Sequence, residues 1–292
     1  MKRRTMRVAR DAREVLAVGR VIAIANQKGG VGKTTTAINL AVALAQGGRR
    51  VLLVDLDPQG NATSGLTIVR EAEPVREAAA AQSAPPRKTI YDALVLGAPL
   101  AEVVCEMRPN LYLAPSGGDL VGAEIELATM EGRERRLRLL LEANVLEYNY
   151  VLIDSPPSLG ILTLNALVAA DSVLVPMQCE YYALEGLSSL LATIRKVRTA
   201  LSPGLEIEGL VLTMFDSRNR LSHEIAREVR QHFPDKVFRS VIPRNVRLSE
   251  SPSHGLSAIE YDPRSSGAEG YRMLAAEIIE RVEGAAPAPA GG

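Results

Sequence analysis

The stretch that most constrains the fold is VIAIANQKGGVGKTTT, at residues 21–36. It opens with a short apolar, β-branched run that predicts a buried strand, and apolar residues at helical spacing from Lys33 onward predict a helix. Strand, glycine-rich loop and helix, in that order, form the context of a phosphate-binding loop. The loop glycines let successive N–H groups turn into one concavity, and the positive end of the helix dipole adds to that field. We therefore expect a site for a nucleotide phosphate.

This loop supplies a set of candidate nucleotide contacts. We expect the Lys33 ammonium to reach the β- and γ-phosphates and the Thr34 hydroxyl to ligate Mg²⁺. One residue departs from the usual pattern, because Gln27 stands where that pattern has glycine. The candidate nucleotide-binding residues of the loop are Lys28, Gly29, Gly30, Val31, Gly32, Lys33, Thr34 and Thr35.

Two further apolar segments end in aspartate. Val51–Asp55 runs into a polar turn that contains Asp57, and Tyr150–Asp154 runs into Ser-Pro-Pro-Ser. Ligands of open parallel α/β sheets lie at the carboxyl ends of the strands, so both segments predict carboxylates beside the phosphate loop. Asp154 fits the Walker B aspartate, which holds Mg²⁺ directly or through a water molecule. A carboxylate at the end of the first of these segments, Asp55 or Asp57, can orient or deprotonate the attacking water or hold a magnesium-bound water, and Asp55 is also a candidate outer-sphere magnesium contact.

The composition fits one large domain. The chain has 292 residues, of which 47% are hydrophobic and 23% charged, so it can bury a sizeable core. Apolar strands alternate with helical segments over residues 21–283, which predicts a single α/β domain with a doubly wound, mostly parallel sheet flanked by helices. Residues 1–20 carry seven Lys/Arg against two Asp/Glu and form a basic extension, either solvated or in contact with DNA. Residues 284–292 predict a disordered tail.

Several local features complete this division. Residues 70–88 are rich in Ala, Pro, Glu and Arg and predict a surface insertion, whereas Glu124–Ala143 predicts a helix with a solvated charged face. Cys105, assigned to a loop, and Cys179 give no disulfide framework, which points to a reducing cytoplasm. No apolar run approaches the roughly 18–20 residues that span a bilayer.

A further lysine of the loop, Lys28, extends the interpretation. KGGVGKTT, which includes Lys28, resembles the deviant phosphate loop of the ParA, MinD and nitrogenase-iron-protein class of ATPases. From Val21 to about Ile279 the chain is similar to the chromosomal, Soj-type ParA partition ATPases. The stretches that carry this similarity are NQKGGVGKTT, LVDLDPQGNATSGL, VLIDSPPS, VPMQCEYYALEGL, LTMFDSRN and VIPRNVRLSESPSHG.

The resemblance implies roles for individual residues. In that family the first loop lysine, here Lys28, reaches across a dimer interface to the nucleotide of the partner subunit. The second aspartate of VDLDPQG, here Asp57, is tied to hydrolysis and switching. The segment that contains Pro243 and Asn245 packs on the adenine base. ATP and Mg²⁺ are the implied cofactors, and the implied reaction is ATP hydrolysis.

The distribution of basic residues indicates a polyanionic partner. Formal net charge is zero, yet residues 195–250 carry eleven Lys/Arg against seven Asp/Glu. No helix-turn-helix signature accompanies them, so we expect phosphate contact without base reading. The resemblance implies an ATP-bound homodimer that binds nucleoid DNA non-specifically and is stimulated by a ParB-type centromere-binding protein, hence a cytoplasmic, nucleoid-associated protein. The first candidates for DNA contact are Arg195, Arg218 and Arg247.

Three alternatives belong to neighbouring classes. A MinD-like ATPase that cycles on membranes needs an amphipathic C-terminal helix, whereas this tail is Ala, Pro and Gly. A redox ATPase of the nitrogenase-iron-protein type needs two cysteines per subunit for a shared four-iron cluster, and Cys105 and Cys179 do not match the placement. A plasmid-type ParA carries an N-terminal DNA-reading domain, for which twenty residues are too few.

Overall fold

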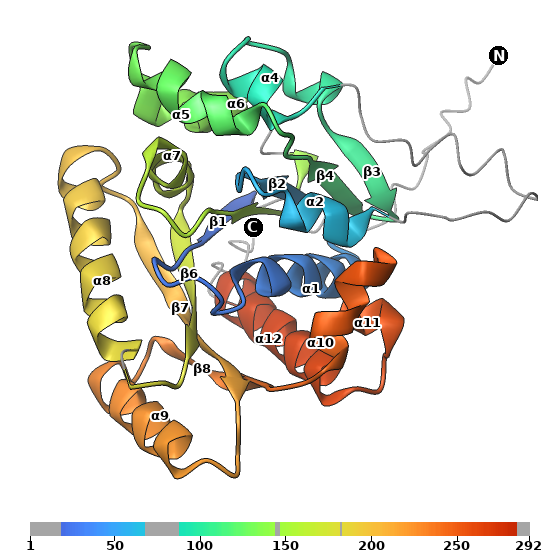
Figure 1. Ribbon diagram of the computed structural model, residues 1–292, viewed down its shortest axis with the longest axis vertical. Helices are drawn as coiled ribbons and strands as arrows, with labels where there is room; N and C mark the ends of the chain where they lie inside the picture. The colour runs from blue at the N-terminus through green and yellow to red at the C-terminus, as the bar shows by residue number, and fades with distance from the viewer. Residues whose placement is uncertain (1–18, 68–87, 144–146, 182, 285–292) are drawn as a thin grey trace, which may run out of the picture.

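The computed structural model describes residues 19–67, 88–143, 147–181 and 183–284, and Figure 1 shows its arrangement. Within those ranges the strands form one eight-stranded sheet in the order β3-β4-β2-β5-β1-β6-β7-β8. Neighbouring strands are parallel except for the edge pair β3 and β4, which is antiparallel. The predicted doubly wound, mostly parallel sheet is therefore confirmed.

The strands follow the apolar runs of the sequence. They are β1 (Arg20–Ile24), β2 (Val51–Asp55), β3 (Cys105–Arg108), β4 (Leu111–Ala114), β5 (Tyr150–Asp154), β6 (Ser172–Gln178), β7 (Glu206–Phe215) and β8 (Val237–Pro243). Every residue of β2 and β5 is buried, as expected for central strands covered on both faces.

Helices connect the strands, and the first begins at Lys33, as predicted. They are α1 (Lys33–Gln46), α2 (Asn61–Leu66), α4 (Ile90–Leu94), α5 (Leu120–Ala128), α6 (Arg136–Glu142), α7 (Ile161–Ala169), α8 (Ala183–Ala200), α9 (Arg220–His232), α10 (Arg247–Glu250), α11 (Ala258–Tyr261) and α12 (Ser266–Glu283). Short 3₁₀ turns are η1 (Leu100–Glu102), η2 (Arg133–Arg135) and η4 (Ser251–His254).

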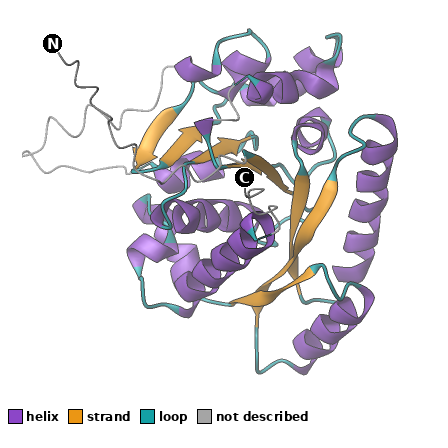
Figure 2. Ribbon diagram, turned by 180° about the vertical axis from the view of Figure 1, so that it is seen from behind, coloured by secondary structure: helices purple, strands orange, loops and turns teal. Residues whose placement is uncertain are grey.

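Two clusters of buried side chains cover the two faces of the sheet. Along β2, Leu52 and Val54 belong to one cluster, whereas Val51 and Leu53 belong to the other, as the two-residue period of a strand requires. Helices α4 to α9 bury their apolar sides in the first cluster, and α1, α2, α11 and α12 do so in the second. Figures 1 and 2 show the resulting three layers, with α8 and α9 on the opposite side of the sheet from α1 and α12.

Three local predictions were wrong. Arg20, assigned to the N-terminal extension, is the first residue of β1 and pairs with Tyr150. Cys105, assigned to a loop, begins the edge strand β3, whose sequence CEMR has no apolar alternation and is fixed by pairing with β4. The segment predicted as one helix at 124–143 is divided between α5 and α6, because Gly132 adopts a left-handed φ of 64°.

Other predictions fall on residues 1–18, 68–87 and 285–292, which are outside the described part of the chain. These ranges hold most of the basic extension, nearly all of the surface insertion and the Ala/Pro/Gly tail. They remain predictions from the sequence.

Candidate nucleotide-binding site

The strand register brings the phosphate loop and the aspartates to one edge of the sheet. Ile24, the last residue of β1, pairs with Asp154 of β5, and Asp154 pairs in turn with Asp55 of β2. The segments that follow these strands therefore leave the sheet side by side at its carboxyl edge. The ammonium of Lys33 lies close enough to Asp154 and Asp57 for their charges to raise its pKa, so these three predicted residues lie together.

The phosphate loop curls through two left-handed glycines. Gly30 has a φ of 74° and Gly32 a φ of 86°, a region that side chains disfavour, and Gly32 is the N-cap of α1. Strand β7 supports the loop from outside, because the Thr213 hydroxyl donates a 2.8 Å hydrogen bond to the carbonyl of Val31. The next residue, Met214, holds a φ of 48°. This is backbone strain beside a candidate ligand site, where such strain is commonly found.

Lys33 is held inside the loop rather than in solvent. Its residue surface is 7% exposed, and its ammonium lies 3.4 Å from the carbonyl oxygen of Lys28. Burial lowers its pKa below the ordinary lysine value, while the negative charges of Asp154 and Asp57 oppose that shift. A buried cation of this kind is prepared to bind an anion.

Asp154 is the most unusual group of the site. It is fully buried, and neither carboxylate oxygen makes a hydrogen bond of good geometry with the described residues, although the Thr34 hydroxyl lies close enough to lower its pKa. Burial is the main cause that raises its pKa well above the ordinary value, followed by the charge of Asp55. Buried polar atoms are normally satisfied, so an orphaned carboxylate beside a hydroxyl fits the Mg²⁺ position predicted for Asp154 and Thr34.

Asp55 has a different environment on the neighbouring strand. It accepts hydrogen bonds from the backbone N and the hydroxyl of Thr63, at 2.8 and 2.7 Å. Burial nevertheless raises its pKa to about 6. Asp57 is 7% exposed and is fixed from two sides, since Oδ1 accepts from the N–H of Gln59 at 3.0 Å and its carbonyl accepts from the hydroxyl of Ser116 at 2.7 Å.

Comparison with known proteins agrees with this geometry. A family model described as an AAA domain matches residues 19–207. The chromosome partitioning protein ParA of Myxococcus xanthus is 53% identical over 266 residues, which cover 90% of this chain and 89% of that protein. The sporulation initiation inhibitor protein Soj of Bacillus subtilis is 53% identical over 262 residues, which cover 89% of this chain and 98% of that protein. The chain belongs to the ParA/Soj family of partition ATPases.

Solved structures place the family fold among related nucleotide-binding proteins. A cobyrinic acid a,c-diamide synthase from Mycobacterium smegmatis, crystallised with ADP and magnesium, has a TM-score of 0.75 and 34% identity, and covers 94% of this chain and 99% of its own. A plasmid partition protein from Borrelia burgdorferi has a TM-score of 0.71 and 25% identity, and covers 90% and 99%. Because the first of these carries another activity, the shared fold alone does not define function, and the ParA/Soj assignment rests on the closer sequence similarity.

The family resemblance assigns Pro243 and Asn245 to the adenine base. Both residues lie at the carboxyl edge of the sheet, at the end of β8. Pro243 ends β8 and pairs in register with Phe215 of β7. The amide of Asn245 donates to the hydroxyl of Ser266 at 2.9 Å, and its oxygen accepts from the N–H of Arg247 at 2.8 Å. The structure thus positions both residues near the end of β8, and their contact with adenine stays a prediction.

The three candidate DNA-contacting arginines are not brought together in one subunit. Arg195 lies exposed on α8, a helix of the first buried cluster, whereas Arg247 begins α10, whose Leu248 packs against the second. Arg218 follows β7 and pairs with the carboxylate of Asp216 at 3.1 Å. Arg247 pairs with Glu250 and Asp262, at 2.9 and 3.2 Å. Only Arg195 of these three forms no ion pair with the described residues.

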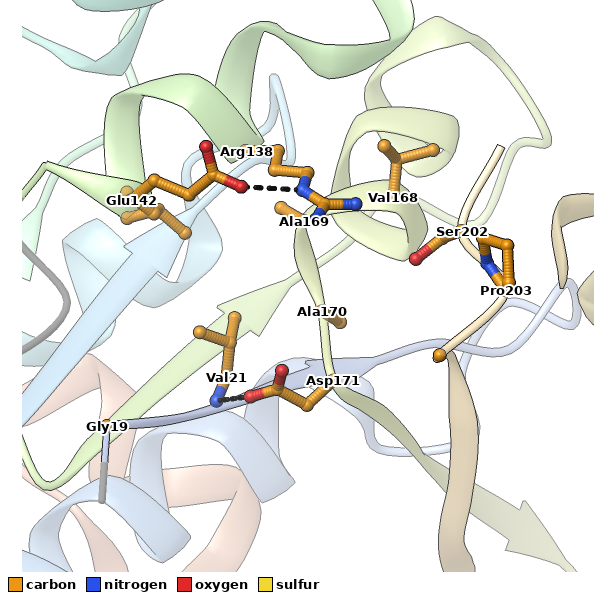
Figure 3. Close-up of a pocket in the computed structure, with 12 residues that line it drawn as sticks. Gly19, Val21, Arg138, Glu142, Val168, Ala169, Ala170, Asp171, Ser202 and Pro203 are labelled. Atoms are coloured by element: carbon orange, nitrogen blue, oxygen red, sulfur yellow. Dashed lines mark hydrogen bonds and ion pairs between the residues drawn. The ribbon is translucent and has the colours of Figure 1, made fainter. Parts of the chain in front are cut away.

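A cavity of about 280 Å³ lies away from the phosphate loop (Figure 3). It is formed at the amino ends of β1 and β6, next to Val21 and Asp171. Its charged groups are already paired, since the Asp171 carboxylate accepts from the N–H of Val21 at 2.8 Å and Arg138 pairs with Glu142 at 2.8 Å. Because these charges are paired and the cavity lies away from the phosphate loop, the carboxyl edge remains the candidate site.

The two cysteines do not approach each other through the sheet. Cys105 begins β3 at one edge, whereas Cys179 follows β6, and four strands separate β3 from β6. Burial raises the pKa of the Cys179 thiol to about 11, so it stays protonated. The described residues contain no group of three or more His, Cys, Asp or Glu side chains suited to a metal.

Sequence reasoning missed several residues that hold the site. Thr63 binds Asp55, Ser116 binds the carbonyl of Asp57, and Thr213 binds the loop at Val31. Asn26 links the loop to β6, because its amide donates to the carbonyl of Pro176 at 2.7 Å. Thr63, Asn26 and Thr213 lie inside the motifs quoted above, which was the available signal, whereas Ser116 comes from a segment outside them and needed the fold.

Proposed function

We propose that this chain is an ATP-dependent, dimerising partition ATPase that binds DNA non-specifically and hydrolyses ATP under stimulation by a ParB-type protein. The observation that carries the proposal is the orphaned Asp154 carboxylate next to Thr34, on the same edge as a left-handed glycine loop with a buried lysine. It would act in the cytoplasm on the nucleoid. No helix of the described ranges is long and apolar enough to cross a bilayer.

The phosphate loop would bind the triphosphate of ATP. Backbone N–H groups of residues 29–35 would line its concavity, and the Lys33 ammonium would neutralise phosphate charge. Thr34 and Asp154 would hold Mg²⁺, which supplies charge neutralisation on the phosphates when bound. An M. smegmatis neighbour 34% identical to this chain was crystallised with an ATP analogue and magnesium, which supports these cofactors.

Asp57 would orient or deprotonate the attacking water. At the carboxyl edge its Oδ1 accepts from the N–H of Gln59, and its backbone carbonyl accepts from the Ser116 hydroxyl, so the residue is held in place. A positioned base of this kind contributes to hydrolysis by bringing water into line with the γ-phosphate. Lys28, the second candidate catalytic group, would come from the partner subunit and add positive charge at the phosphates.

Exposed apolar side chains support dimerisation through the carboxyl edge. Leu159, Tyr181 and Val246 follow β5, β6 and β8, and are 50%, 75% and 63% exposed. Large apolar side chains grouped around a polar site are typical of an interaction surface. A second copy docked on this edge would cover them and would bring its Lys28 to the nucleotide.

DNA would bind to the dimer through arginine contacts with phosphates. Arg195 is the best placed of the three candidates, because it is exposed and forms no ion pair within the described ranges; Arg218 and Arg247 must exchange carboxylate partners for phosphates. Two subunits double the number of contacts, so binding would fall steeply with salt.

DNA retention in different nucleotide states tests this proposal. Duplex DNA of unrelated sequences is mixed with protein and Mg²⁺ in the presence of a non-hydrolysable ATP analogue, ADP or no nucleotide. We expect retention with the analogue alone and no preference among sequences. Equal retention in all three states, or a strong sequence preference, would reject the nucleotide-gated mechanism.

A further inference from the structure

The ammonium of Lys28 forms an ion pair with the carboxylate of Glu180 in its own subunit. The pair joins the segments that follow β1 and β6, which are parallel neighbours in the sheet. Both side chains are partly accessible, with 37% of Lys28 and 45% of Glu180 exposed. No role for Glu180 follows from the motifs, yet it contacts the very lysine that the proposed dimer requires on the partner's nucleotide.

Both ends of this ion pair are held by the backbone. The N–H of Lys28 donates to the side-chain oxygen of Asn26 at 3.0 Å, and Asn26 is itself tied to the carbonyl of Pro176 in β6. The N–H of Glu180 donates to the carbonyl of Gln178 at 2.9 Å. The backbone is thus fixed at both residues, so only the two side chains lose freedom when the charges meet, which favours the pair within one subunit.

The same loop is tied to helix α8 by the residue before Lys28. The Gln27 side-chain oxygen accepts from the Ser189 hydroxyl at 3.0 Å, and its amide approaches the Thr193 hydroxyl at 3.4 Å. Residues 27 and 28 therefore bind the segment around α8 at two points. Gln27 is the residue that departs from the usual phosphate-loop glycine, and its amide makes these contacts where glycine has none.

We propose that Glu180 is a positioning residue that keeps Lys28 in its own subunit until a nucleotide-loaded partner competes for it. The inference rests on the proposed function, because it assumes that Lys28 acts across the dimer. Two such ion pairs must break each time a dimer forms. Glu180 thereby opposes dimerisation, and the phosphates of the partner's ATP replace the carboxylate as the counter-charge of Lys28.

Glu180→Gln tests the proposal, since it keeps the shape of the side chain and removes its charge. Partly exposed ion pairs are individually weak, but two break per dimer, so the dimer dissociation constant should fall roughly tenfold. The measurement is sedimentation of protein saturated with a non-hydrolysable ATP analogue and Mg²⁺. Glu185→Gln is the matched control, because Glu185 is an exposed carboxylate on α8, the helix that follows Glu180, and forms no ion pair with the described residues.

Two further readouts separate positioning from a structural role. ADP affinity and melting temperature should be equal for the wild type and Glu180→Gln, because neither depends on dimerisation. The difference in dimer dissociation constant should shrink at high salt, which screens exposed charges. Should Glu180→Gln fold poorly, Glu180→Ala serves in the same measurements.

The outcomes distinguish this inference from the proposed function. If wild type and Glu180→Gln dimerise equally, or if Glu180→Gln dimerises more weakly, Glu180 does not restrain Lys28 and the inference is wrong. The second result would assign Glu180 to the partner's Lys28 instead. If Lys28→Ala dimerises like the wild type, the proposed function itself fails, whatever Glu180 does.

Discussion

Asp55 and Asp154 pair in register at the ends of β2 and β5, and both are fully buried. Their surroundings are unequal. Asp55 accepts two hydrogen bonds from Thr63, whereas Asp154 has no hydrogen bond of good geometry with the described residues. Asp55 is thus satisfied by the protein, and Asp154 is the carboxylate available to a cation beside Thr34.

Replacement of Asp154 by asparagine should separate ligand binding from stability. Asp154→Asn removes one of two buried, mutually repelling charges, so the nucleotide-free protein should be as stable as the wild type or more stable. Affinity for the ATP analogue in Mg²⁺ should fall by roughly tenfold or more, as for loss of a metal-site partner. Calorimetric titration with the ATP analogue, once in Mg²⁺ and once in a chelator, measures this affinity with and without the metal. An unchanged dependence on Mg²⁺ would remove Asp154 from the site.

The raised pKa of Asp55 predicts a pH dependence of stability. Its pKa is about 6 in the fold against an ordinary value of 3.8, so the folded protein binds this proton more tightly than the unfolded chain. The associated stability is present below about pH 4 and is lost as pH rises through about 6. The loss is on the order of 3 kcal/mol.

Glu277 and Glu283 have lowered pKa values and contribute with the opposite sign, since their stability is lost as pH falls. The contribution of Asp55 is therefore measured as a difference in unfolding free energy between two proteins. Denaturant unfolding of the wild type and Asp55→Asn is compared between pH 4 and 7 in metal-free buffer. The free-energy difference between the two proteins should change across this range, and a constant difference would contradict the assignment.

The glycines of the phosphate loop allow a matched pair of substitutions. Gly32 has a φ of 86°, so Gly32→Ala should cost about 1–2 kcal/mol of stability and weaken nucleotide binding. Gly29 has no left-handed φ, and no atom lies within 4 Å of an added Cβ, so Gly29→Ala should leave the free energy of unfolding nearly unchanged. Denaturant unfolding of nucleotide-free protein measures both. Equal losses would show that the left-handed conformation is not the constraint.

Much of this site was predictable from the sequence because each of its parts is a short local pattern. The buried strand, the loop and α1 follow from the pattern at residues 21–36, and Asp154 from an apolar strand that ends in aspartate. The strand β3 was missed because CEMR has no alternation of its own, and pairing with β4 decides its conformation. Glu180 and Thr213 were missed for a related reason, since they reach the loop after β1 from the end of β6 and from β7, and these contacts depend on sheet order.

Reversal of one charge on α8 should separate DNA binding from dimerisation. Arg195→Glu should abolish ATP-dependent DNA retention, because it replaces a phosphate contact by repulsion, while the dimer should form normally. Arg272→Glu is the control, since Arg272 is exposed on α12, on the opposite side of the sheet. Electrophoretic mobility and sedimentation measure the two properties. Normal DNA retention by Arg195→Glu would exclude this arginine from the interface.

The central claim is that two subunits close around two ATP molecules before either binds DNA. Sedimentation of the wild type and Lys28→Ala, each saturated with a non-hydrolysable ATP analogue and Mg²⁺, tests it most directly. We expect a wild-type dimer, a monomer with ADP, and a Lys28→Ala monomer that still binds the analogue. A wild type that stays monomeric when saturated, or a Lys28→Ala variant that dimerises as well as the wild type, would contradict the account.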